Sequence, residues 1–376
     1  MEEEEIERIV ERHEKYRLGG INLIPSENFI MSRVRNLLSS DLAGRYESEW
    51  YGGSRYAREI CERTVALAKK LFGAKHAIVT ALSGNICDLA VIFSFTKSGD
   101  TVAGVPKEHG GYPFGYEKFE RKFYPLPMKD YVVNAEEVKN MEKDFPLILL
   151  ASSIIPFPHP VRSIRDAMRG WMAYDASHVL GLIAGGKFQQ PLKEGADVMI
   201  GSTHKTFPGP QGGIVVTNSD EVAERMEKYL LFDYDEGIGL VDNPHVNRIA
   251  ALGAALEEMI RNGREYASRV IRNAKHLARN LHEGGLRVRF EERDFTESHQ
   301  ILLDMEKEEA GRLYRKLEEN GIFIDCIGRI GVAEVSHIGM KEEEMEKIAH
   351  LILDVMKGKD VREEAKKLAM EFYSTF

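Results

Sequence analysis

Apolar residues recur along this chain with two different periods, one typical of helices and the other of buried strands. Residues 2–17 carry apolar side chains at helical spacing among charges, which predicts an amphipathic helix that ends at the Gly19-Gly20 pair. Residues 247–282 repeat this spacing over a much longer stretch, and their arginines form the opposite, solvated face. We therefore expect a helical arm at the N-terminus and a long helix after residue 246.

Short runs that are apolar at almost every position lie between about residues 60 and 245. Each run is expected to form a strand, and the runs cover residues 77–80, 101–105, 147–151, 171–174, 198–201 and 214–217. Helical segments separate them, among them residues 62–72 and a helix that opens at Ser83-Gly84-Asn85. Strands that are apolar on both faces and alternate with helices predict a mostly parallel sheet covered on both sides. We therefore expect a large α/β domain over residues 21–246.

After Gly284-Gly285 the pattern becomes mixed. Strands are expected at residues 288–290, 299–305, 322–325 and 330–335, with a helix at residues 308–320. Two terminal helices follow, and Asp360 with Glu363 three residues later matches a capping box at the start of the last helix. The sequence thus predicts an N-terminal helical arm over residues 1–20, the large domain, and linking helices with a smaller C-terminal α+β domain over residues 247–376.

The composition is that of a soluble globular protein. Of 376 residues, 43% are hydrophobic and 30% are charged, and the net charge of −9 argues against binding to nucleic acid or to an anionic membrane. No apolar run reaches the ~20 residues that a membrane-spanning helix needs. The acidic first residues lack the features of an export signal. Three cysteines far apart in sequence predict neither a disulfide nor a metal site, and they fit a cytoplasmic location.

Residues 197–213 have the pattern of a reactive site. An apolar run stops at Gly201 and is followed by Ser202, Thr203 and, two residues later, Lys205, before a turn rich in proline and glycine. Burial at the end of a strand can lower the pKa of a lysine, and a neutral amine can form a Schiff base with a carbonyl cofactor. The hydroxyls before the lysine could hold a phosphate, and the glycines after it let backbone come close. We predict that Lys205 is the covalent anchor of a cofactor.

Two other strand ends provide matching groups. Ser83-Gly84-Asn85 lies between a strand and a helix, where backbone amides and the helix dipole can hold a phosphate. Asp175 ends a strand at the edge where α/β sheets bind ligands, and its carboxylate could pair with a pyridine nitrogen. His178 follows three residues later, and His109, with two glycines after it, could stack on a cofactor ring. A phosphate-binding turn, an aspartate and a lysine in this order are expected of a pyridoxal-phosphate site.

With these groups in place, the chain resembles the serine hydroxymethyltransferase family, which are fold-type-I pyridoxal-phosphate enzymes, over most of its length. The most specific motifs are Ser26-Glu27-Asn28-Phe29 and Thr203-His204-Lys205-Thr206 with the Gly-Pro-x-Gly-Gly turn after it. The other motifs are Tyr51-Gly52-Gly53, residues 71–76, Ser83-Gly84, His109-Gly110-Gly111, residues 175–178, residues 244–247 and Arg329-Ile330-Gly331. The resemblance implies a mostly parallel sheet of the seven-stranded type, a smaller C-terminal α+β domain, and a homodimer with shared active sites.

The resemblance also implies roles for individual residues. Lys205 would hold the cofactor, Asp175 would pair with its pyridine nitrogen and His178 would support its phenolic oxygen. The implied cofactor contacts are Ser83, Gly84, Asn85, His109, Ser153, Asp175, His178, Ser202, His204 and Lys205. Ser26 and Arg329 would hold the carboxylate of a small amino-acid substrate. Tyr51 of the neighbouring subunit would face the cofactor, and a tetrahydropterin is the candidate co-substrate.

The sequence departs from the family's pattern in two segments that bear on the acceptor. Residues 46–50 compress a longer family segment, so that either Glu47 or Glu49 could be the proton-transfer group. The loop before Arg329 is also short, which affects the pterin side more than the amino-acid side. We expect reversible cleavage of a β-hydroxy amino acid, as in hydroxymethyl transfer from serine. The alternatives are a pterin-independent threonine-type aldolase or an aminotransferase on the same fold, and a paralogue that binds the cofactor without turnover.

Overall fold

The computed structural model describes residues 5–141, 143–235 and 237–374, and the chain divides into two compact units. One unit, here called the terminal unit, joins Met1–Phe29 to Ser268–Phe376. The other, the central unit, is the continuous segment Ile30–Ala267. The domain limits expected from the sequence, at residues 20 and 246, stay a prediction.

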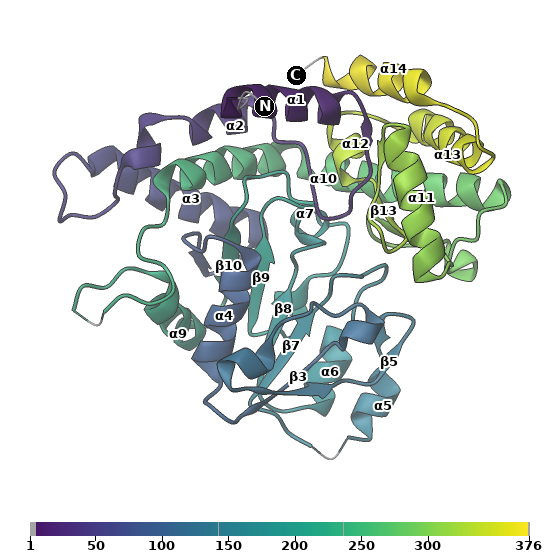
Figure 1. Cartoon of the computed structure of the whole chain (residues 1–376). Helices are drawn as coiled ribbons and strands as arrows, with labels where there is room; N and C mark the ends of the chain where they lie inside the picture. Colours follow the sequence, from purple (N-terminus) through teal and green to yellow (C-terminus); the bar gives the residue numbers. More distant parts are fainter. Residues whose placement is uncertain (1–4, 142, 236, 375–376) are drawn as a thin grey trace. The chain divides into compact units, whose positions relative to one another are not determined.

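A seven-stranded sheet forms the middle of the central unit (Figure 1). From one edge to the other its strands are β2 (His76–Ile78), β10 (Gly213–Thr217), β9 (Val198–Ser202), β8 (Trp171–Asp175), β7 (Leu147–Ala151), β3 (Thr101–Gly104) and β4 (Lys122–Pro125). β10 runs antiparallel to both of its neighbours, whereas the pairs from β9 to β4 are parallel. The expected mostly parallel sheet with seven strands is therefore confirmed.

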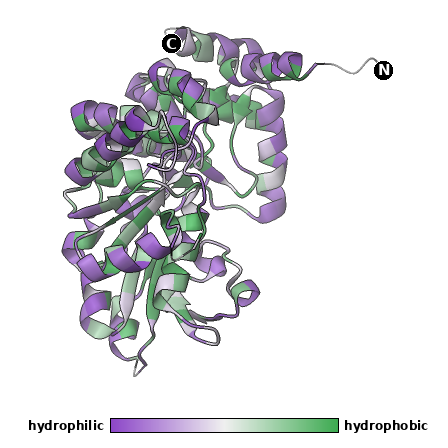
Figure 2. Cartoon of the chain, turned by 90° about the vertical axis from the view of Figure 1, so that its left-hand side faces the viewer, coloured by the Kyte–Doolittle hydropathy of each residue, from purple (hydrophilic) through white to green (hydrophobic). Residues whose placement is uncertain are grey.

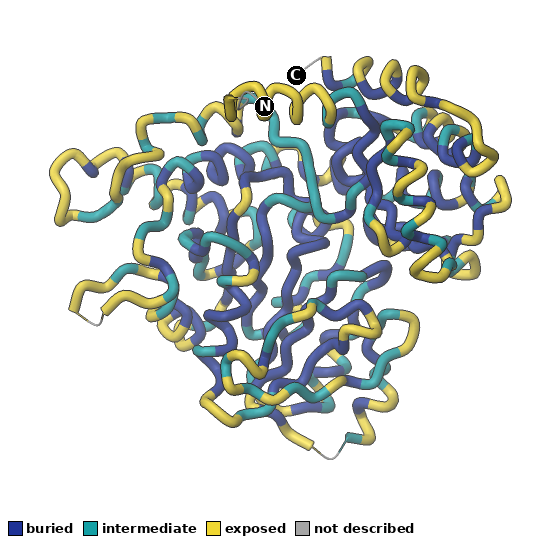
Figure 3. The backbone as a smooth tube through the Cα atoms, viewed as in Figure 1, coloured by how far each residue is buried: buried dark blue, intermediate teal, exposed yellow. Residues whose placement is uncertain are grey.

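The sheet is the core of this unit. β7, β9 and β10 are buried at every position (Figure 3), and their residues are predominantly apolar (Figure 2). α4 (Gly84–Phe95) packs against β8, β9 and β10 and is itself buried along most of its length. A helix that is apolar all round is expected where it is enclosed on all sides. This helix positions its first turn at the ends of the strands, where the candidate site lies.

The remaining elements of the central unit are shorter or more exposed. The helices are α2 (Ser32–Leu38), α3 (Arg55–Phe72), α5 (Ala135–Lys139), α6 (Val161–Ala167), α7 (Leu180–Ala184), α8 (Pro191–Glu194) and α9 (Asp220–Leu230). The short elements are β5 (Met128–Lys129), β6 (Val132–Val133), η1 (Asp41–Gly44), η2 (Lys107–His109) and η3 (Tyr116–Phe119). α10 (Val246–Glu283) is the long helix expected from the sequence, and it continues into the terminal unit.

The terminal unit contains two short pairs of strands. β1 (Ile21–Asn22) pairs in parallel with β12 (Ile322–Phe323), and β11 (Gln300–Leu302) pairs antiparallel with β13 (Arg329–Gly331). The other elements are α1 (Ile6–Leu18), η4 (Glu291–Arg293), α11 (Lys307–Glu319), α12 (Ala333–His337), α13 (Glu342–Met356) and α14 (Arg362–Tyr373). The mixture of helices and short strands agrees with the α+β character expected of the C-terminal part.

All four strands expected in this unit are shorter in the structure. Those at residues 299–305 and 322–325 are reduced to β11 and β12. The other two differ further from the prediction. At residues 288–290 only Val288 takes part in pairing, as an isolated bridge. Phe290 has a φ of 67°, in the left-handed region, which is incompatible with an extended strand. The strand expected at residues 330–335 ends at Gly331, because α12 begins two residues later. The prediction of a strand is therefore wrong for the residues after Val288 and for those after Gly331.

The capping box expected at the start of the last helix is not formed. The N-cap residue of α14 is Val361, whose side chain makes no capping hydrogen bond. The carboxylate of Asp360 accepts instead from the backbone N–H of Arg362 (3.1 Å) and forms an ion pair with its guanidinium. A carboxylate one residue before the N-cap thus satisfies a backbone donor of the first turn.

Among the described residues, no helix is long and apolar enough to cross a membrane. In the same part of the chain, no group of three or more His, Cys, Asp or Glu side chains is arranged to hold a metal ion. Cys61, Cys87 and Cys326 are free cysteines. Burial raises the pKa of the Cys61 thiol to about 12 and that of Cys87 well above its ordinary value, so both thiols stay protonated near neutral pH.

Candidate active site

The carboxyl ends of β8 and β9 are joined by hydrogen bonds at the candidate site. Asp175 is the last residue of β8 and Ser202 the last of β9, and both are buried. The backbone N–H of Ser202 donates to Oγ of Ser177 (2.8 Å), and that hydroxyl donates to Oδ1 of Asp175 (2.5 Å). The backbone N–H of Ser177 donates to the same oxygen (2.8 Å). Two donors on Oδ1 fix the orientation of the carboxyl group and leave Oδ2 for another partner.

Lys205 lies in the turn after β9 and is partly buried. Its Nζ is 3.3 Å from Nε2 of His178. The hydroxyl of Thr206 donates to the backbone oxygen of His178 (2.8 Å), and the hydroxyl of Tyr266 donates to the backbone oxygen of Thr206 (2.7 Å). These bonds connect the lysine turn to the segment after β8 and to α10, so the backbone on both sides of the amine is held in place.

The N-terminus of α4 lies against the same strand ends. Ser83 is its N-cap residue, and its Oγ accepts from the backbone N–H of Ile86 (3.2 Å). A side chain at Gly84 would place Cβ only 2.3 Å from Oγ of Ser202 and 3.0 Å from Oγ of Ser177. Glycine therefore permits a close approach that a larger residue would prevent. A helix N-terminus beside hydroxyl groups is suited to an anion such as a phosphate.

Three other polar residues near the candidate site have different surroundings. Asn85 is exposed, and its Oδ1 accepts from the hydroxyl of Tyr112 (3.2 Å), while His204 is half-buried. The hydroxyl of Thr203, which the sequence suggested for a phosphate, donates to the backbone oxygen of Pro210 (2.6 Å) in a fully buried position. The suggestion for Thr203 is wrong, because its hydroxyl closes the turn around Lys205 instead.

The turn that carries His109 is joined to the segment after β7. His109 is exposed and ends η2. Gly110 has a φ of 81°, and a Cβ at this position would lie 2.6 Å from Cβ of Ile154. The backbone N–H of Ser153 donates to the oxygen of Gly110 (2.7 Å). Glycine is required here both by the left-handed backbone and by the close contact.

The structure adds one residue that the sequence reading missed. Asp88 lies in α4, one turn after Gly84, and is only 2% exposed. Its Oδ1 has no hydrogen-bond partner among the described residues. Burial and the neighbouring charge of Asp175 raise the pKa of the Asp88 carboxyl well above its ordinary value, and Lys205 opposes the rise. The sequence signal for this residue is a carboxylate inside an otherwise apolar helix.

In the terminal unit, the loop that carries Ser26 is packed against the strand that begins with Arg329. The backbone N–H of Gly331 donates to the oxygen of Leu23 (2.8 Å). A Cβ at Gly331 would lie 2.4 Å from Cα of Pro25, so glycine is needed for this contact. Both residues expected to hold a substrate carboxylate therefore belong to neighbouring segments of this unit.

Arg329 forms an ion pair within the unit. The residue is 9% exposed, and its Nε donates to Oδ2 of Asp325 (2.6 Å). The backbone N–H of Arg329 donates to Oδ1 of the same carboxylate (3.0 Å). A guanidinium is a planar group with five N–H donors, and this pair fixes its orientation.

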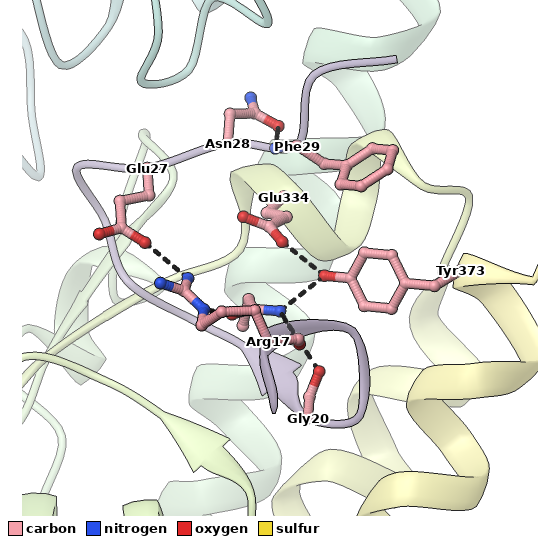
Figure 4. A network of polar contacts seen from close by, with 8 residues as sticks. Arg17, Gly20, Glu27, Asn28, Phe29, Glu334 and Tyr373 are labelled. Carbon is pink, nitrogen blue, oxygen red and sulfur yellow. Dashed lines mark hydrogen bonds and ion pairs between the residues drawn. The ribbon is translucent and has the colours of Figure 1, made fainter. Parts of the chain in front are cut away.

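A partly buried polar network supports the loop after β1 (Figure 4). Nη2 of Arg17 donates to Oε2 of Glu27 (2.6 Å), and Nε of Arg17 donates to Oδ1 of Asn22 (2.7 Å). Nδ2 of Asn22 donates to the hydroxyl of Tyr373 (2.8 Å), which donates to Oε1 of Glu334 (2.5 Å). The network connects α1, the loop after β1, α12 and α14, so it fixes the residue next to Ser26.

Ionisation of the buried Glu334 carboxyl should make the protein less stable as the pH rises. Burial raises the pKa of its carboxyl to about 7, and Glu27 adds to the rise, whereas Tyr373 and Arg17 oppose it. In the unfolded chain this carboxyl ionises near its ordinary pKa of 4.5. The free energy of unfolding should therefore fall as the pH rises from there through 7, by on the order of 3 kcal/mol from this group.

Glu334→Gln stays neutral at every pH and should remove this part of the pH dependence. Urea unfolding of both proteins at about pH 5 and about pH 8 measures the difference. Glu343→Gln changes an exposed carboxylate on α13 and is the matched control. An equal loss of stability in Glu334→Gln and in the unmodified protein would contradict the assignment.

The candidate proton-transfer groups line a cavity of about 340 Å³ in the central unit. Glu47, Glu49 and Tyr51 are on its surface, whereas Lys205 and Asp175 are not among its lining residues. Glu47 is half-buried and Glu49 is exposed. Burial raises the pKa of the Glu47 carboxyl. The structure thus distinguishes the two glutamates that the sequence left equivalent.

Residues 46–51 and the loop after α9 expose several aromatic side chains. Tyr46 and Tyr51 stack with ring centroids 4.9 Å apart, and Trp50 and Tyr234 stack with centroids 4.5 Å apart. These four side chains are between 48% and 66% exposed. Clusters of exposed aromatic residues are typical of surfaces that bind another protein.

Comparison with known proteins identifies the relatives of this chain. A model of the family described as serine hydroxymethyltransferase matches residues 1–352. The chain is 39% identical to the serine hydroxymethyltransferase of Methanothermobacter thermautotrophicus, over 99% of this chain and 94% of that protein. It is 38% identical to that of Archaeoglobus fulgidus, over 99% and 92%. Among solved structures it is similar to the L-threonine transaldolase from Pseudomonas fluorescens, with a TM-score of 0.90, 27% identity and coverage of 98% and 91%. The chain therefore belongs to the serine hydroxymethyltransferase family and has the α/β fold of the fold-type-I pyridoxal-phosphate enzymes.

Proposed function

We propose that this chain catalyses the reversible cleavage of serine to glycine, with transfer of the hydroxymethyl carbon to a tetrahydropterin. The proposal rests on the arrangement of Lys205, His178 and Asp175 at the carboxyl ends of β8 and β9, with the N-terminus of α4 beside them. In a member of this family, that arrangement supports a site for pyridoxal phosphate and a small amino acid.

The side chains at the strand ends fit this cofactor. We propose that Lys205 attaches it covalently and that Asp175 pairs with its pyridine nitrogen through Oδ2, since Oδ1 already accepts two hydrogen bonds. The N-terminus of α4, with Ser83 and Ser202, would hold its phosphate. The other proposed contacts are Gly84, Asn85, His109, Ser153, His178 and His204. The bound cofactor supplies an electron sink for the bond that breaks at the substrate Cα.

The amino acid would be held by the terminal unit. Arg329 offers charge-assisted hydrogen bonds to the substrate carboxylate, and Asp325 keeps its guanidinium in one orientation through the 2.6 Å bond to Nε. Ser26 would donate its hydroxyl to the same carboxylate from a loop that the packing of Gly331 holds in place. Binding the carboxylate at two points orients the Cα–Cβ bond that is cleaved.

We also propose a cytoplasmic homodimer with shared active sites. Lys205 is not on the cavity lined by Glu47 and Tyr51, so a second copy of the chain would supply these two groups to each Lys205 site. The exposed stacked aromatic residues of that segment support an interface there. A groove of about 490 Å³ lined by residues of α2, α3 and α10 adds apolar surface to the same unit.

A second activity is supported by one relative. The structure similar to this chain at a TM-score of 0.90 is named an L-threonine transaldolase. The two segments that bear on a pterin, residues 46–50 and 326–328, are short in this sequence. We therefore propose that the chain also cleaves a β-hydroxy amino acid with a larger side chain, such as threonine, whose aldehyde product leaves without an acceptor.

The test is an assay of the cofactor-loaded protein with serine or threonine, each with and without tetrahydrofolate. We expect glycine formation from serine to increase with the acceptor and aldehyde release from threonine to be independent of it. Formation of a keto acid in place of glycine would identify an aminotransferase. Bound cofactor whose absorbance does not respond to serine, glycine or threonine would refute a catalytic function.

A further inference from the structure

The carboxyl group of Asp88 has no role in the reaction described above, although it lies at the same site. Its Oδ1 is fully buried and has no hydrogen-bond partner among the described residues. The charged groups that act on it are Asp175 and Lys205, the two residues proposed to hold the cofactor ring. A buried polar atom without a partner, next to these groups, indicates that its partner is a ligand.

The geometry of α4 directs this side chain toward the strand ends. Asp88 follows Gly84 by four residues, so both lie on the same face of the helix. Gly84 is in contact with Ser177 and Ser202, which follow or end β8 and β9. Side chains of a helix lean toward its N-terminus, so the carboxyl of Asp88 leans toward the turn that contacts these serines.

A structural role alone does not account for this carboxyl. An unsatisfied buried polar group destabilises the folded protein, and the helix around Asp88 is otherwise mostly apolar. An apolar residue of the same size would remove that cost, as at Leu89, Val91 and Ile92. This destabilisation is removed only in a state of the protein in which the carboxyl group has a hydrogen-bond partner.

We propose that Asp88 is a cofactor-positioning residue, which donates a hydrogen bond from its carboxyl group to an oxygen of bound pyridoxal phosphate. The proposal rests on the function proposed above. It assigns different states to two neighbouring carboxyls, of which Asp175 accepts hydrogen bonds and Asp88 donates one.

The surroundings of the two carboxyls support this assignment. Burial raises the pKa of the Asp175 carboxyl, but Lys205 and the two hydrogen bonds from Ser177 oppose the rise and favour its charged form. Oδ1 of Asp88 receives none among the described residues, and burial and Asp175 raise the pKa of its carboxyl well above the ordinary value, which favours the protonated form. The other titratable groups that interact with Asp88 are Cys87, Tyr112 and Tyr116.

Two variants test the proposal by cofactor binding rather than by activity. Asp88→Leu removes the donor, and Asp88→Asn keeps a neutral donor of the same shape. Titration of the cofactor-free protein with pyridoxal phosphate should show a Kd about tenfold higher for Asp88→Leu, the loss of one hydrogen bond. The Kd of Asp88→Asn should stay within about threefold of the unmodified protein. Ser94→Ala, which changes a buried polar residue farther along α4, is the control and should leave the Kd unchanged.

The stability of the cofactor-free protein gives an independent reading. Asp88→Leu should unfold at a higher urea concentration than the unmodified protein, since it replaces an unsatisfied polar group by an apolar one. A carboxyl with a purely structural role would instead make the variant less stable without changing the Kd, and that result would overturn the proposal.

Other outcomes also decide the question. A Kd for Asp88→Asn as high as that of Asp88→Leu would show that the acid form is not the donor. If Asp88→Leu does not fold, Asp88→Asn tests the proposal alone. The visible absorbance of the cofactor bound to Asp88→Asn should change with pH at the same midpoint as in the unmodified protein. A midpoint displaced by more than about one pH unit would overturn the proposal. Unmodified protein that binds no pyridoxal phosphate would refute the proposed function instead.

Discussion

Replacement of Lys205 by alanine should give a protein that still binds pyridoxal phosphate, but without a covalent bond and with almost no activity. The charge of Lys205 acts on both Asp88 and Asp175, and its Nζ lies 3.3 Å from His178, so the amine is at the centre of the candidate site. Loss of a covalent anchor typically lowers kcat by at least about a thousandfold. The contacts to the phosphate and to the pyridine nitrogen would remain, which is why binding should persist.

Reduction with borohydride followed by peptide mapping measures the attachment directly. The unmodified protein should retain the cofactor on the peptide that contains Lys205, and Lys205→Ala should retain none. Lys187→Ala, which changes an exposed lysine after α7, is the matched control and should keep both label and activity. A label on any other lysine of the unmodified protein would contradict the site assignment.

The position of Lys205 and Asp175 in the fold could be predicted because it depends on short-range patterns. The strands that precede them are apolar on both faces, so their limits are visible in the sequence. Parallel strands place their carboxyl ends at one edge of the sheet, and the register pairs Asp175 with Ile200, two residues before Ser202. The neighbourhood of the two residues then follows from topology.

Asp88 could not be predicted in this way. α4 is buried along most of its length, so its sequence has no polar face from which a residue pointing to a site could be identified. The contact of Gly84 with Ser202 places the Asp88 side chain near the candidate site, and these two residues are far apart in the sequence. That contact belongs to tertiary structure.

The residues that hold Ser26 and Arg329 in position could not be predicted from the sequence for the same reason. Asn22 and Tyr373 are 351 positions apart, and nothing in their local sequence indicates that they share a hydrogen bond. The sequence pattern predicts a strand over residues 322–325, whereas β12 ends at Phe323 and the carboxylate of Asp325 forms an ion pair with Arg329. Periodicity predicts elements, and polar pairs between elements need the folded chain.

Glu47→Gln should lower kcat for serine cleavage by about a hundredfold or more, the usual contribution of a positioned acid or base. Glu47 is half-buried and burial raises the pKa of its carboxyl, as is common for groups that exchange protons near neutral pH. Arg58 opposes this rise and Glu62 adds to it. Glu49 is exposed, and Glu49→Gln is the matched control, which should leave kcat within about threefold. Equal losses in both variants would show that the cavity does not distinguish them.

Mixing two inactive chains tests in which subunit Glu47 acts. Lys205 is not among the residues that line the 340 Å³ cavity with Glu47, so the proposal places Glu47 in the site of a second copy. A hybrid dimer of Lys205→Ala and Glu47→Gln chains would then contain both lesions in one site and none in the other. Random pairing makes half of the dimers hybrid, so co-expressed chains should recover about a quarter of the unmodified activity. If Glu47 acted within its own chain, each site of the hybrid would contain one lesion, and the mixture would stay as inactive as its components.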